Sequence, residues 1–327
     1  MGSLFAVSVV VVTYNSATTI RACLASIPRD CEVVVVDQSS SDDTIVVASS
    51  VRHDARIISA GSNRGFGSGC NLGAANAQGD VLIFMNPDGA FLDGAVKSLV
   101  QQVRIRDALV GPRITDEDGF DQTRARFWST PLSILGEVCL PTALTKVLLL
   151  RDIPPEYSVY RHGGPVPYVQ GTCMAVSAKN FWLAGGFDER FFLYHEEEVL
   201  ARRLESIGVP AVLNPAAVIT HLGARSTSQV RDFAARQYYR SAALAMMLHH
   251  RLPTAIPAAV ALWLLLEMMA ILTPVRMRIG LRKEKYRSWY RSGAAGAAAG
   301  LFGRVVLPPP AARPTNVLAL TTNSKVV

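Results

Sequence analysis

The stretch SVVVVTYNS, residues 8–16, sets an unbroken run of β-branched residues directly before three polar ones. A continuous apolar run of this length predicts a strand that is buried on both faces of a sheet. The run reaches polar Thr13, Tyr14 and Asn15 after too few apolar residues to span a bilayer. It also lacks the basic start and the small-residue cleavage site of a signal peptide. We therefore expect a core strand here and not a leader.

The same rhythm of apolar runs and helical patterns continues through the first hundred residues. Further strands are predicted at 31–37, 55–59 and 80–88, and helical spacing of apolar residues recurs at 19–27, 41–51, 66–78 and 95–104. Continuous apolar strands that alternate with helices are typical of a parallel sheet covered on both faces. The predicted fold class is α/β, with a Rossmann-like, mostly parallel sheet.

Polar residues follow three of these strands. They lie at Thr13–Ser16, at Asp37–Ser41, which includes Ser39, and at Asn86–Asp88. In parallel sheets the carboxyl ends of the strands share one edge, where ligands bind. A loop rich in turn formers would explain any one of the three, but all three together favour a binding site.

The glycine-rich stretch GSNRGFGSGCNLG, residues 61–73, does not match a dinucleotide fingerprint. Cys70 stands where the third glycine of that fingerprint is required, and the segment follows the third strand instead of the first. A Rossmann oxidoreductase is therefore disfavoured. The glycines leave two interpretations open: close approach of the backbone to a phosphate or sugar, or an ordinary helix-start loop.

The composition limits the classes of binding partner but does not identify one of them. Half of the 327 residues are hydrophobic and the formal net charge is +7. This balance suits acidic partners such as nucleic acid, anionic lipid or phosphorylated substrates, and contact with a membrane. The five cysteines are odd in number and never form a Cys-x-x-Cys pair, so we expect reduced, mostly buried thiols instead of disulfides or a zinc site.

Three consecutive glutamates occur in FFLYHEEEVLARR, residues 191–203. A helix that begins near Glu196, with a buried stripe of Leu200, Leu204 and Ile207, puts Glu196 and Glu197 on the two flanks of that stripe. The same geometry turns Glu198 toward solvent.

Four segments, taken in order, resemble the inverting family 2 glycosyltransferases with a GT-A fold, and within them the bacterial rhamnosyltransferase-like branch. The resemblance spans roughly residues 6–245. The segments that carry it are VVVVTYNS, VVVVDQSSSDDT, NRGFGSGCNLGAANAQGDVLIFMNPD and GTCMAVSAKNFWLAGGFDERFFLYHEEE.

The resemblance implies a nucleotide-sugar donor site at the polar strand ends. Asp37 matches the residue that accepts a hydrogen bond from the nucleotide base. Arg203 matches an arginine of the family's acidic motif, and here it must pair with another acid, such as Glu196, or reach phosphate. The full set of donor-binding candidates is Thr13, Tyr14, Asn15, Asp37, Ser39, Asn63, Gly65, Phe66, Asn71, Asn86 and Arg203.

The resemblance also implies a divalent metal ion, Mg²⁺ or Mn²⁺. Asn86-Pro87-Asp88 matches the family's short Asp-x-Asp motif, with Asn86 in place of the first Asp, so Asp88 becomes the main ligand. A hard cation held by oxygen ligands neutralises the charge that develops on a diphosphate leaving group. His221 resembles a downstream histidine that joins the metal or the diphosphate; a structural histidine at a strand end is the other interpretation.

Inverting transfer needs a carboxylate that deprotonates the acceptor hydroxyl group. The family motif is Glu-Asp-x-Asp-Leu-x-x-Arg, and its second acid is the base. Glu197 matches that acid with one more methylene, Glu196 becomes the supporting acid, and Val199 replaces the third acid.

Beyond residue 230 the chain becomes apolar and basic. The apolar stretch 258–273 is shorter than a span of about 20 residues, so we expect a core or interfacial helix, and the following VRMRIGLRKEKYRSWYR suits an anionic membrane surface. No nucleic-acid-binding motif accompanies it. The predicted division is a catalytic domain at 1–230, a helical membrane-associating region at 231–305 and a disordered tail at 306–327.

The resulting prediction is a cytoplasmic glycosyltransferase that is peripheral to the inner face of the cell membrane. It would use a nucleotide-sugar donor, with dTDP-rhamnose first, and a polyprenyl-diphosphate-linked saccharide acceptor of the cell envelope. A UDP-sugar or galactofuranose donor, and a non-catalytic nucleotide-sugar-binding assembly protein, stay open. The sequence also leaves the oligomeric state open, a homo-oligomer included.

Overall fold

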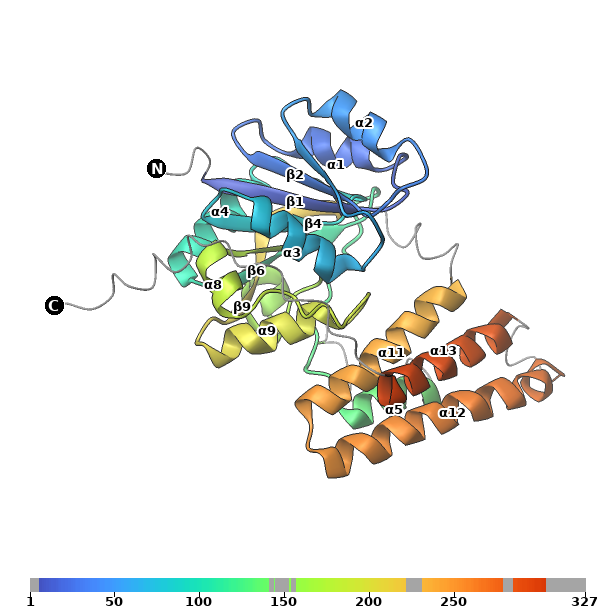
Figure 1. Cartoon of the computed structure of the whole chain (residues 1–327). Coiled ribbons are helices and arrows are strands. Elements are labelled where there is room, and N and C mark those ends of the chain that lie inside the picture. Colours follow the sequence, from blue (N-terminus) through green and yellow to red (C-terminus); the bar gives the residue numbers. More distant parts are fainter. Residues whose placement is uncertain are drawn as a thin grey trace.

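The computed structural model describes residues 6–140, 144, 153, 157–221, 231–278 and 285–303. Figure 1 shows two parts: a layered sheet with its helices, and a group of helices at one end of the molecule. The predicted tail at 306–327 lies outside the described residues, as does residue 305.

In the described chain nine strands form a single sheet in the order β3-β2-β1-β4-β8-β6-β9-β5, with β7 paired to β9. Their bounds are Val7–Thr13 (β1), Glu32–Asp37 (β2), Arg56–Ser59 (β3), Val81–Met85 (β4), Gly89–Phe91 (β5), Leu109–Thr115 (β6), Gly164–Val166 (β7), Cys173–Ser177 (β8) and Ala211–His221 (β9).

The first four strands are parallel neighbours, as the sequence predicted. Thr13 at the end of β1 is in register with Asp37 at the end of β2, and Asp37 is in register with Ser59 of β3. Because β4 runs parallel to β1, the segment after Met85 reaches the same edge. The polar strand ends are therefore brought together.

The second half of the sheet is mixed. β8 is antiparallel to both β4 and β6, while β6 and β9 are parallel. Antiparallel pairing of β5 with β9 puts Gly89 opposite His221. Strands were predicted from the sequence only for the first hundred residues, so the pairing in this half of the sheet was not predicted.

The helices have the following bounds: Ile20–Ser26 (α1), Thr44–Val51 (α2), Phe66–Asn76 (α3), Ala95–Arg106 (α4), Pro131–Cys139 (α5), Val159–His162 (α7), Ala178–Leu183 (α8), Glu196–Ser206 (α9), Arg231–His249 (α11), Leu252–Arg278 (α12) and Lys285–Phe302 (α13). α1, α2 and α4 pack on one face of the sheet with Val9 and Val11. α3, α8 and α9 pack on the other face with Val10 and Val12. The alternation of side chains along β1 thus supplies both cores.

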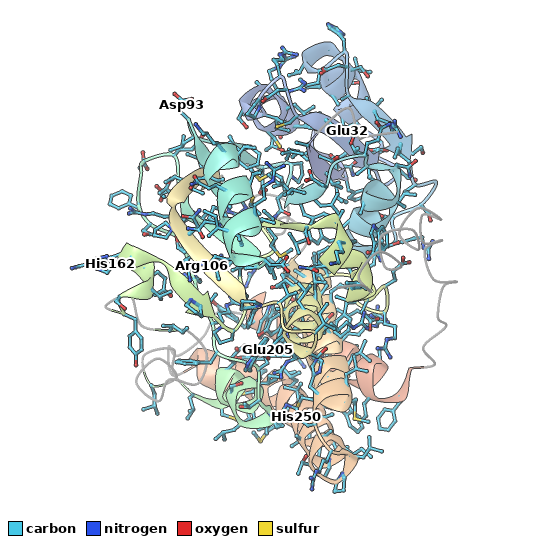
Figure 2. The ribbon with its side chains drawn as sticks, turned by 90° about the vertical axis from the view of Figure 1, so that its left-hand side faces the viewer. Glu32, Asp93, Arg106, His162, Glu205 and His250 are labelled. Carbon is cyan, nitrogen blue, oxygen red and sulfur yellow. The ribbon has the colours of Figure 1, made fainter. Side chains whose placement is uncertain are left out.

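A buried carboxylate fastens the start of the sheet. Glu32 at the start of β2 accepts hydrogen bonds from Ser8 Oγ, at 2.5 Å, and from the backbone N–H of Gln78, at 2.7 Å. These contacts join β1, β2 and the segment before β4. Figure 2 labels Glu32 in the sheet part and His250 among the helices at the other end.

The cysteines agree with the sequence analysis. Cys23, Cys31, Cys70 and Cys173 are buried, Cys139 is exposed, and all five are free thiols. Burial raises the pKa of Cys23, Cys70 and Cys173, which keeps these thiols protonated and unreactive.

Helices α5, α11, α12 and α13 share a separate apolar core that includes Ile134, Tyr239, Leu262 and Ala294. α13 approaches α11 closely because it presents small residues: a Cβ added to Gly296 would lie 2.0 Å from the carbonyl oxygen of Arg236. α5 joins this group although it precedes residue 231 in the chain. Figure 1 shows the four helices together.

Helix α12 is apolar on opposite sides. Its inner side buries Ala259, Leu262, Leu266 and Ala270. Its outer side exposes a line of large apolar residues. They are Ile256, Leu264, Met268, Ile271 and Leu272.

The length argument against a membrane span was wrong. The helix continues through Pro257 and Pro274, and Leu252–Pro274 is long and apolar enough to cross a bilayer, with a mean hydropathy of 2.2. One such helix is weak evidence for a span. About a third of that window, 33%, is buried against protein.

Candidate functional site

The ends of β1 and β2 are locked together by short polar contacts. Asn15 Oδ1 accepts a hydrogen bond from the Ser41 backbone at 2.8 Å, and Asp37 accepts two from Ser40, at 3.0 and 2.5 Å. Asn15 and Ser39 both have left-handed φ angles, 50° and 65°. Non-glycine residues in that region are uncommon and gather at functional sites.

Thr13 and Tyr14 differ in exposure at this edge. Thr13 is buried, and its Oγ1 has no hydrogen-bond partner among the described residues, whereas half of Tyr14 is exposed. The backbone turns so that one side chain enters the core and the next faces solvent. The predicted nucleotide contacts of both residues stay predictions.

The loop 61–66 lies beside these strand ends because Gln38 holds it. Gln38 donates to the carbonyl of Gly65 at 2.7 Å and accepts from the Arg64 backbone at 2.9 Å. Asn63 Oδ1 accepts from the Gly65 backbone, and Phe66 N–H donates to the carbonyl of Phe192. The candidates Asn63, Gly65 and Phe66 thus reach the same edge as Asp37.

Gly65 has a steric reason to be glycine. Its φ is 92°, and an added Cβ would lie 2.2 Å from the carbonyl oxygen of Phe192. No side chain fits there without displacing the backbone of the 187–195 loop. This close approach between two backbones joins the loop 61–66 to the segment that leads into α9.

Asn71 has a structural role that the sequence did not predict. Its amide donates to the carbonyl of Phe187 at 2.9 Å and accepts from the Phe187 backbone at 2.9 Å. It also donates to Glu189. Asn71 therefore ties α3 to the loop before α9, and its donor contact stays a prediction.

The two predicted metal ligands meet. His221 Nε2 lies 3.3 Å from Asp88 Oδ1, and both side chains are mostly buried. Pairing of β5 with β9 causes this, since Asp88 directly precedes Gly89 and His221 stands opposite it. In the described chain no third Asp, Glu, His or Cys completes the group. The Asn86 side chain is partly exposed next to it, and its backbone is fixed to Thr172 and Gly89.

Helix α9 begins at Glu196, as predicted, but Glu198 is buried and not solvated. The segment before α5 covers it. Ser129 N–H donates to Glu198 at 2.9 Å, Arg202 donates at 2.9 Å, and His195 Nδ1 lies 3.3 Å away. Burial opposes ionisation of Glu198, but these partners outweigh it and lower its pKa to about 2. Periodicity within one helix could not show that residues 128–130 would pack over it.

The other two glutamates have the opposite electrostatic character. Burial, and then the neighbouring charge of Glu197, raises the pKa of Glu196, whose Oε2 has no hydrogen-bond partner among the described residues. Burial also raises the pKa of Glu197, although its side chain keeps some exposure. A carboxylate whose pKa is raised toward neutrality is a stronger base.

Arg203 finds another acid, as expected, but that acid is not Glu196, and the expected burial of Ile207 was wrong. Arg203 pairs with Asp188 at 2.5 Å and not with Glu196, and Asp188 is also held by Arg190 at 2.6 Å. Ile207 is 45% exposed because the helix ends at Ser206 and the chain turns away there. Arg203 thus braces the 185–190 turn, and its contact with the donor stays a prediction.

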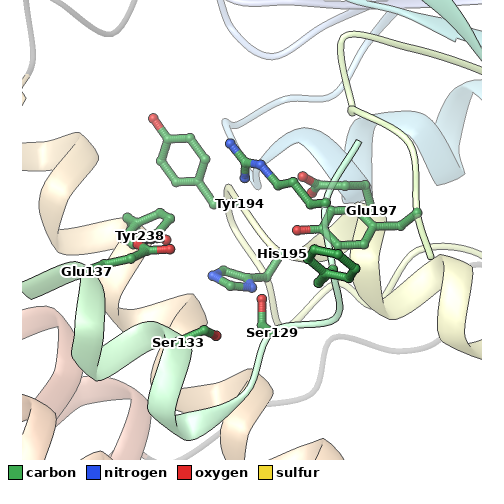
Figure 3. A pocket seen from close by; sticks show the side chains of 10 residues that line it. Ser129, Ser133, Glu137, Tyr194, His195, Glu197 and Tyr238 are labelled. Carbon is green, nitrogen blue, oxygen red and sulfur yellow. Dashed lines mark hydrogen bonds between the residues drawn. The ribbon is translucent and has the colours of Figure 1, made fainter. Parts of the chain in front are cut away.

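A small polar pocket, open to solvent, adjoins Glu197 (Figure 3). It lies between the α9 start, the segment before α5, and α11. Side chains with hydroxyl, carboxylate, imidazole and guanidinium groups dominate its lining. The lining residues are Arg126, Phe127, Ser129, Ser133, Glu137, Tyr168, Tyr194, His195, Glu197 and Tyr238.

The two residues before β8 link Glu197 to the Asn86–Asp88 segment. A Cβ added to Gly171 would lie 3.9 Å from Glu197 Cδ, and the next residue, Thr172, accepts a hydrogen bond from the Asn86 backbone at 2.9 Å. Glu197 therefore lies beside residues 171–172, whose backbone is hydrogen-bonded to the Asn86–Asp88 segment.

Residues 8–153 match the model of Glycosyl transferase family 2. The chain carries a family 2 glycosyltransferase domain. Similar proteins include an N-acetylglucosaminyl-diphospho-decaprenol L-rhamnosyltransferase of Mycobacterium tuberculosis, which is 28% identical in an alignment that covers 68% of this chain and 77% of the relative. A low-salt glycan biosynthesis hexosyltransferase, Agl10, of Haloferax volcanii is 26% identical over 58% of each chain. This glycosyltransferase is thus rhamnosyltransferase-like.

A solved structure supports the fold of the glycosyltransferase. The mannosyltransferase PcManGT from Pyrobaculum calidifontis, in complex with GDP-Man and Mn²⁺, superposes with a TM-score of 0.52 at 17% identity. The superposition covers 91% of this chain and 88% of that one. This likeness shows the GT-A fold, which confirms the predicted fold class.

Several residues of the glycosyltransferase site escaped the sequence analysis. Gln38 was part of a polar strand end but was not singled out. His195 and Glu198 lie within the segment 191–203, and only their i,i+3 spacing at the start of a helix could have indicated that they interact. No sequence pattern indicated that Glu137 and Tyr238 belong to the site, because only tertiary packing brings α5 and α11 beside α9.

Proposed function

We propose that the protein is an inverting glycosyltransferase that moves a sugar from a nucleotide diphosphate to a polyprenyl-diphosphate-linked saccharide of the cell envelope. Rhamnose from dTDP-rhamnose is the first donor candidate, supported by the mycobacterial relative, which is an L-rhamnosyltransferase. A UDP-sugar or galactofuranose donor is the alternative within the fold. A non-catalytic nucleotide-sugar-binding protein is the alternative from another class.

The observation that carries this proposal is the position of Glu197. Its carboxyl group lines a polar pocket and lies beside residues 171–172, whose backbone is hydrogen-bonded to the Asn86–Asp88 segment. A base for inverting transfer has to stand between the acceptor hydroxyl group and the donor sugar. Glu197 is the acid at this junction that faces the open pocket.

One base is sufficient for the proposed transfer reaction. An acceptor hydroxyl oxygen attacks the anomeric carbon of the donor, from the face opposite the diphosphate. The bond between that carbon and the diphosphate oxygen breaks, and the diphosphate leaves with the electron pair. The hydroxyl proton passes to Glu197, whose raised pKa makes it a better acceptor of that proton.

Asp88 and His221 fit a divalent ion. One carboxylate oxygen and one imidazole nitrogen, 3.3 Å apart, give two ligands, so diphosphate oxygens and water would complete the shell. Mg²⁺ and Mn²⁺ both accept such a set, and the nitrogen suits Mn²⁺ better. When bound, the ion stabilises the negative charge that develops on the leaving diphosphate.

A donor panel tests this function. The full chain, with Mg²⁺ or Mn²⁺ and an N-acetylglucosaminyl diphosphate that carries a short lipid, is expected to release nucleoside diphosphate from dTDP-rhamnose faster than from UDP- and GDP-sugars. Release that needs the acceptor supports transfer. Tight donor binding with no acceptor-dependent release under any donor would favour the binding-protein alternative.

We also propose that the protein is cytoplasmic and docks on the inner membrane face through the outer side of α12. Ile256, Leu264, Met268 and Ile271 form a line along this side, and no described segment covers it. The inner side is packed on α5, α11 and α13, so a helix lying in the membrane plane suits these contacts better than a span. We keep the division at residue 230, with α5 assigned to the membrane-associating helices.

Exposed arginines point to an anionic lipid surface as the occupant. Arg251 directly precedes α12, and Arg287 and Arg291 lie exposed on α13, which packs against α12. Basic residues beside an interfacial apolar face add attraction to anionic headgroups. The basic stretch 279–284 lies outside the described residues.

Polar substitutions on α12 test this docking. The pair Leu264→Gln and Ile271→Gln is expected to weaken binding to phosphatidylglycerol-containing vesicles at least about tenfold, because each apolar side chain contributes roughly 1–2 kcal/mol when it leaves water. Co-sedimentation with the vesicles measures this. The matched control is Val46→Gln with Ile105→Gln, two equally exposed residues on α2 and α4. Equal losses in both pairs would contradict docking through α12.

A further inference from the structure

His195 is the residue that the proposed chemistry leaves unexplained. It stands directly before α9 with φ at 66°, and the preceding Tyr194 has φ at 70°. Two successive non-glycine residues in the left-handed region are unfavourable and persist only where the surroundings enforce them. Here the enforced turn points the imidazole into the pocket that Glu197 also lines (Figure 3).

The two ring nitrogens have different environments. Nδ1 lies 3.3 Å from Glu198 Oε2, and the Glu198 carboxylate is held ionised by Arg202 and by the Ser129 N–H. An ionised carboxylate only accepts hydrogen bonds, so Nδ1 carries the proton. Nε2 is buried and has no partner among the described residues, although the imidazole is only 7% exposed.

A buried histidine nitrogen normally has a partner. The rest of the pocket lining offers none to Nε2: Tyr238 is turned to Glu137, with its hydroxyl 2.5 Å from Oε2. The pocket is rich in hydroxyl and carboxylate groups, which suits a polyhydroxylated ligand. A ligand hydroxyl group can satisfy Nε2 in either protonation state of the ring, since it both donates and accepts.

We propose that His195 Nε2 binds one hydroxyl group of the acceptor saccharide, other than the reacting one, and so orients the acceptor against Glu197. This inference rests on the proposed function. Glu198 and Arg202 act through the ring as positioning residues. The pocket between α9, α5 and α11 is then the acceptor-sugar subsite, and His195 determines which sugar it accepts.

Two substitutions separate the two nitrogens. His195→Asn keeps an amide near the Nδ1 position and tolerates the left-handed backbone, but it does not reach the Nε2 position. His195→Gln reaches the Nε2 position. With the short-lipid N-acetylglucosaminyl diphosphate as acceptor, His195→Asn is expected to raise the acceptor KM about tenfold, and His195→Gln to restore part of that loss. The affinity for the nucleotide alone should not change in either variant.

Deoxy analogues of the acceptor identify the contact. In the wild-type enzyme, removal of one hydroxyl group should raise KM about tenfold, and in His195→Asn the same removal should cost nothing further. Equal penalties in both enzymes at every position would overturn the inference. The matched control is His162→Asn, an exposed histidine at the edge of the molecule (Figure 2), which should behave as wild type.

Different results would contradict the proposed function and the proposed role of His195. If the wild-type enzyme transfers sugar to no diphospholipid-linked saccharide, the proposed function is wrong. If the wild-type enzyme transfers normally and His195→Asn leaves KM unchanged, only the role of His195 is wrong. A drop in both nucleotide affinity and acceptor affinity in His195→Asn would mark the residue as structural and would also overturn the inference.

Discussion

We expect Glu197→Gln to lower the rate of sugar transfer by about 10² to 10⁴, the range that general bases contribute. Glutamine has nearly the same shape but accepts no proton, so the acceptor hydroxyl group is no longer activated. Nucleotide affinity should stay within a factor of two of wild type, since Glu197 faces the pocket and not the ends of β1 and β2. Single-turnover kinetics and isothermal titration with the nucleotide measure the two effects.

The pH dependence gives the same residue a second signature. Burial raises the pKa of Glu197 above that of an exposed glutamate. The base works only when deprotonated, so kcat/KM should rise with pH and reach its plateau above the raised pKa, later than for an ordinary glutamate. Glu205→Gln, an exposed position at the end of the same helix (Figure 2), is the control. Transfer that survives Glu197→Gln at a wild-type rate would remove Glu197 as the base.

We expect Asp88→Asn to abolish the stimulation of transfer by Mg²⁺ or Mn²⁺. The amide keeps the size of the side chain but removes the charge, which leaves His221 as one neutral ligand of the pair. Loss of a metal contact at a developing charge costs several kcal/mol, so we expect a decrease in rate of a hundredfold or more. Stopped assays across a metal titration measure it.

A binding measurement separates the metal effect from misfolding. In wild-type protein Mn²⁺ should strengthen nucleoside diphosphate binding, whereas in Asp88→Asn the affinity should be the same with and without Mn²⁺. Asp93→Asn, an exposed aspartate a few residues further on, is the matched control. Undiminished metal stimulation in Asp88→Asn would mean that the ion binds elsewhere.

Most of the donor side of the site could be predicted from the sequence. Continuous apolar runs predicted β1, β2 and β4, and parallel pairing then necessarily gathers Thr13, Asp37 and Asp88 at one edge. The meeting of Asp88 with His221 needed the resemblance, because β5 and β9 are far apart in sequence.

The acceptor side could not be predicted in the same way. Helical periodicity turned Glu198 to solvent, because an isolated helix has only one buried face. The structure packs residues 128–130 over a second face and gives Glu198 the partners Ser129, Arg202 and His195. The missing acid at Val199 leaves Arg203 without a partner on its own helix, and Asp188 supplies one from the preceding turn.

The sequence by itself determined the parallel half of the sheet, the polar edge and the start of α9, because these depend on local periodicity and on which strand ends carry polar residues. Only the tertiary structure decided which glutamate is buried and ionised and which faces the pocket. It also decided that α5 and α11 form the wall opposite Glu197. These outcomes depend on contacts between segments that lie 69 to 101 residues apart in the sequence, where desolvation and hydrogen bonding set the state of each carboxyl group.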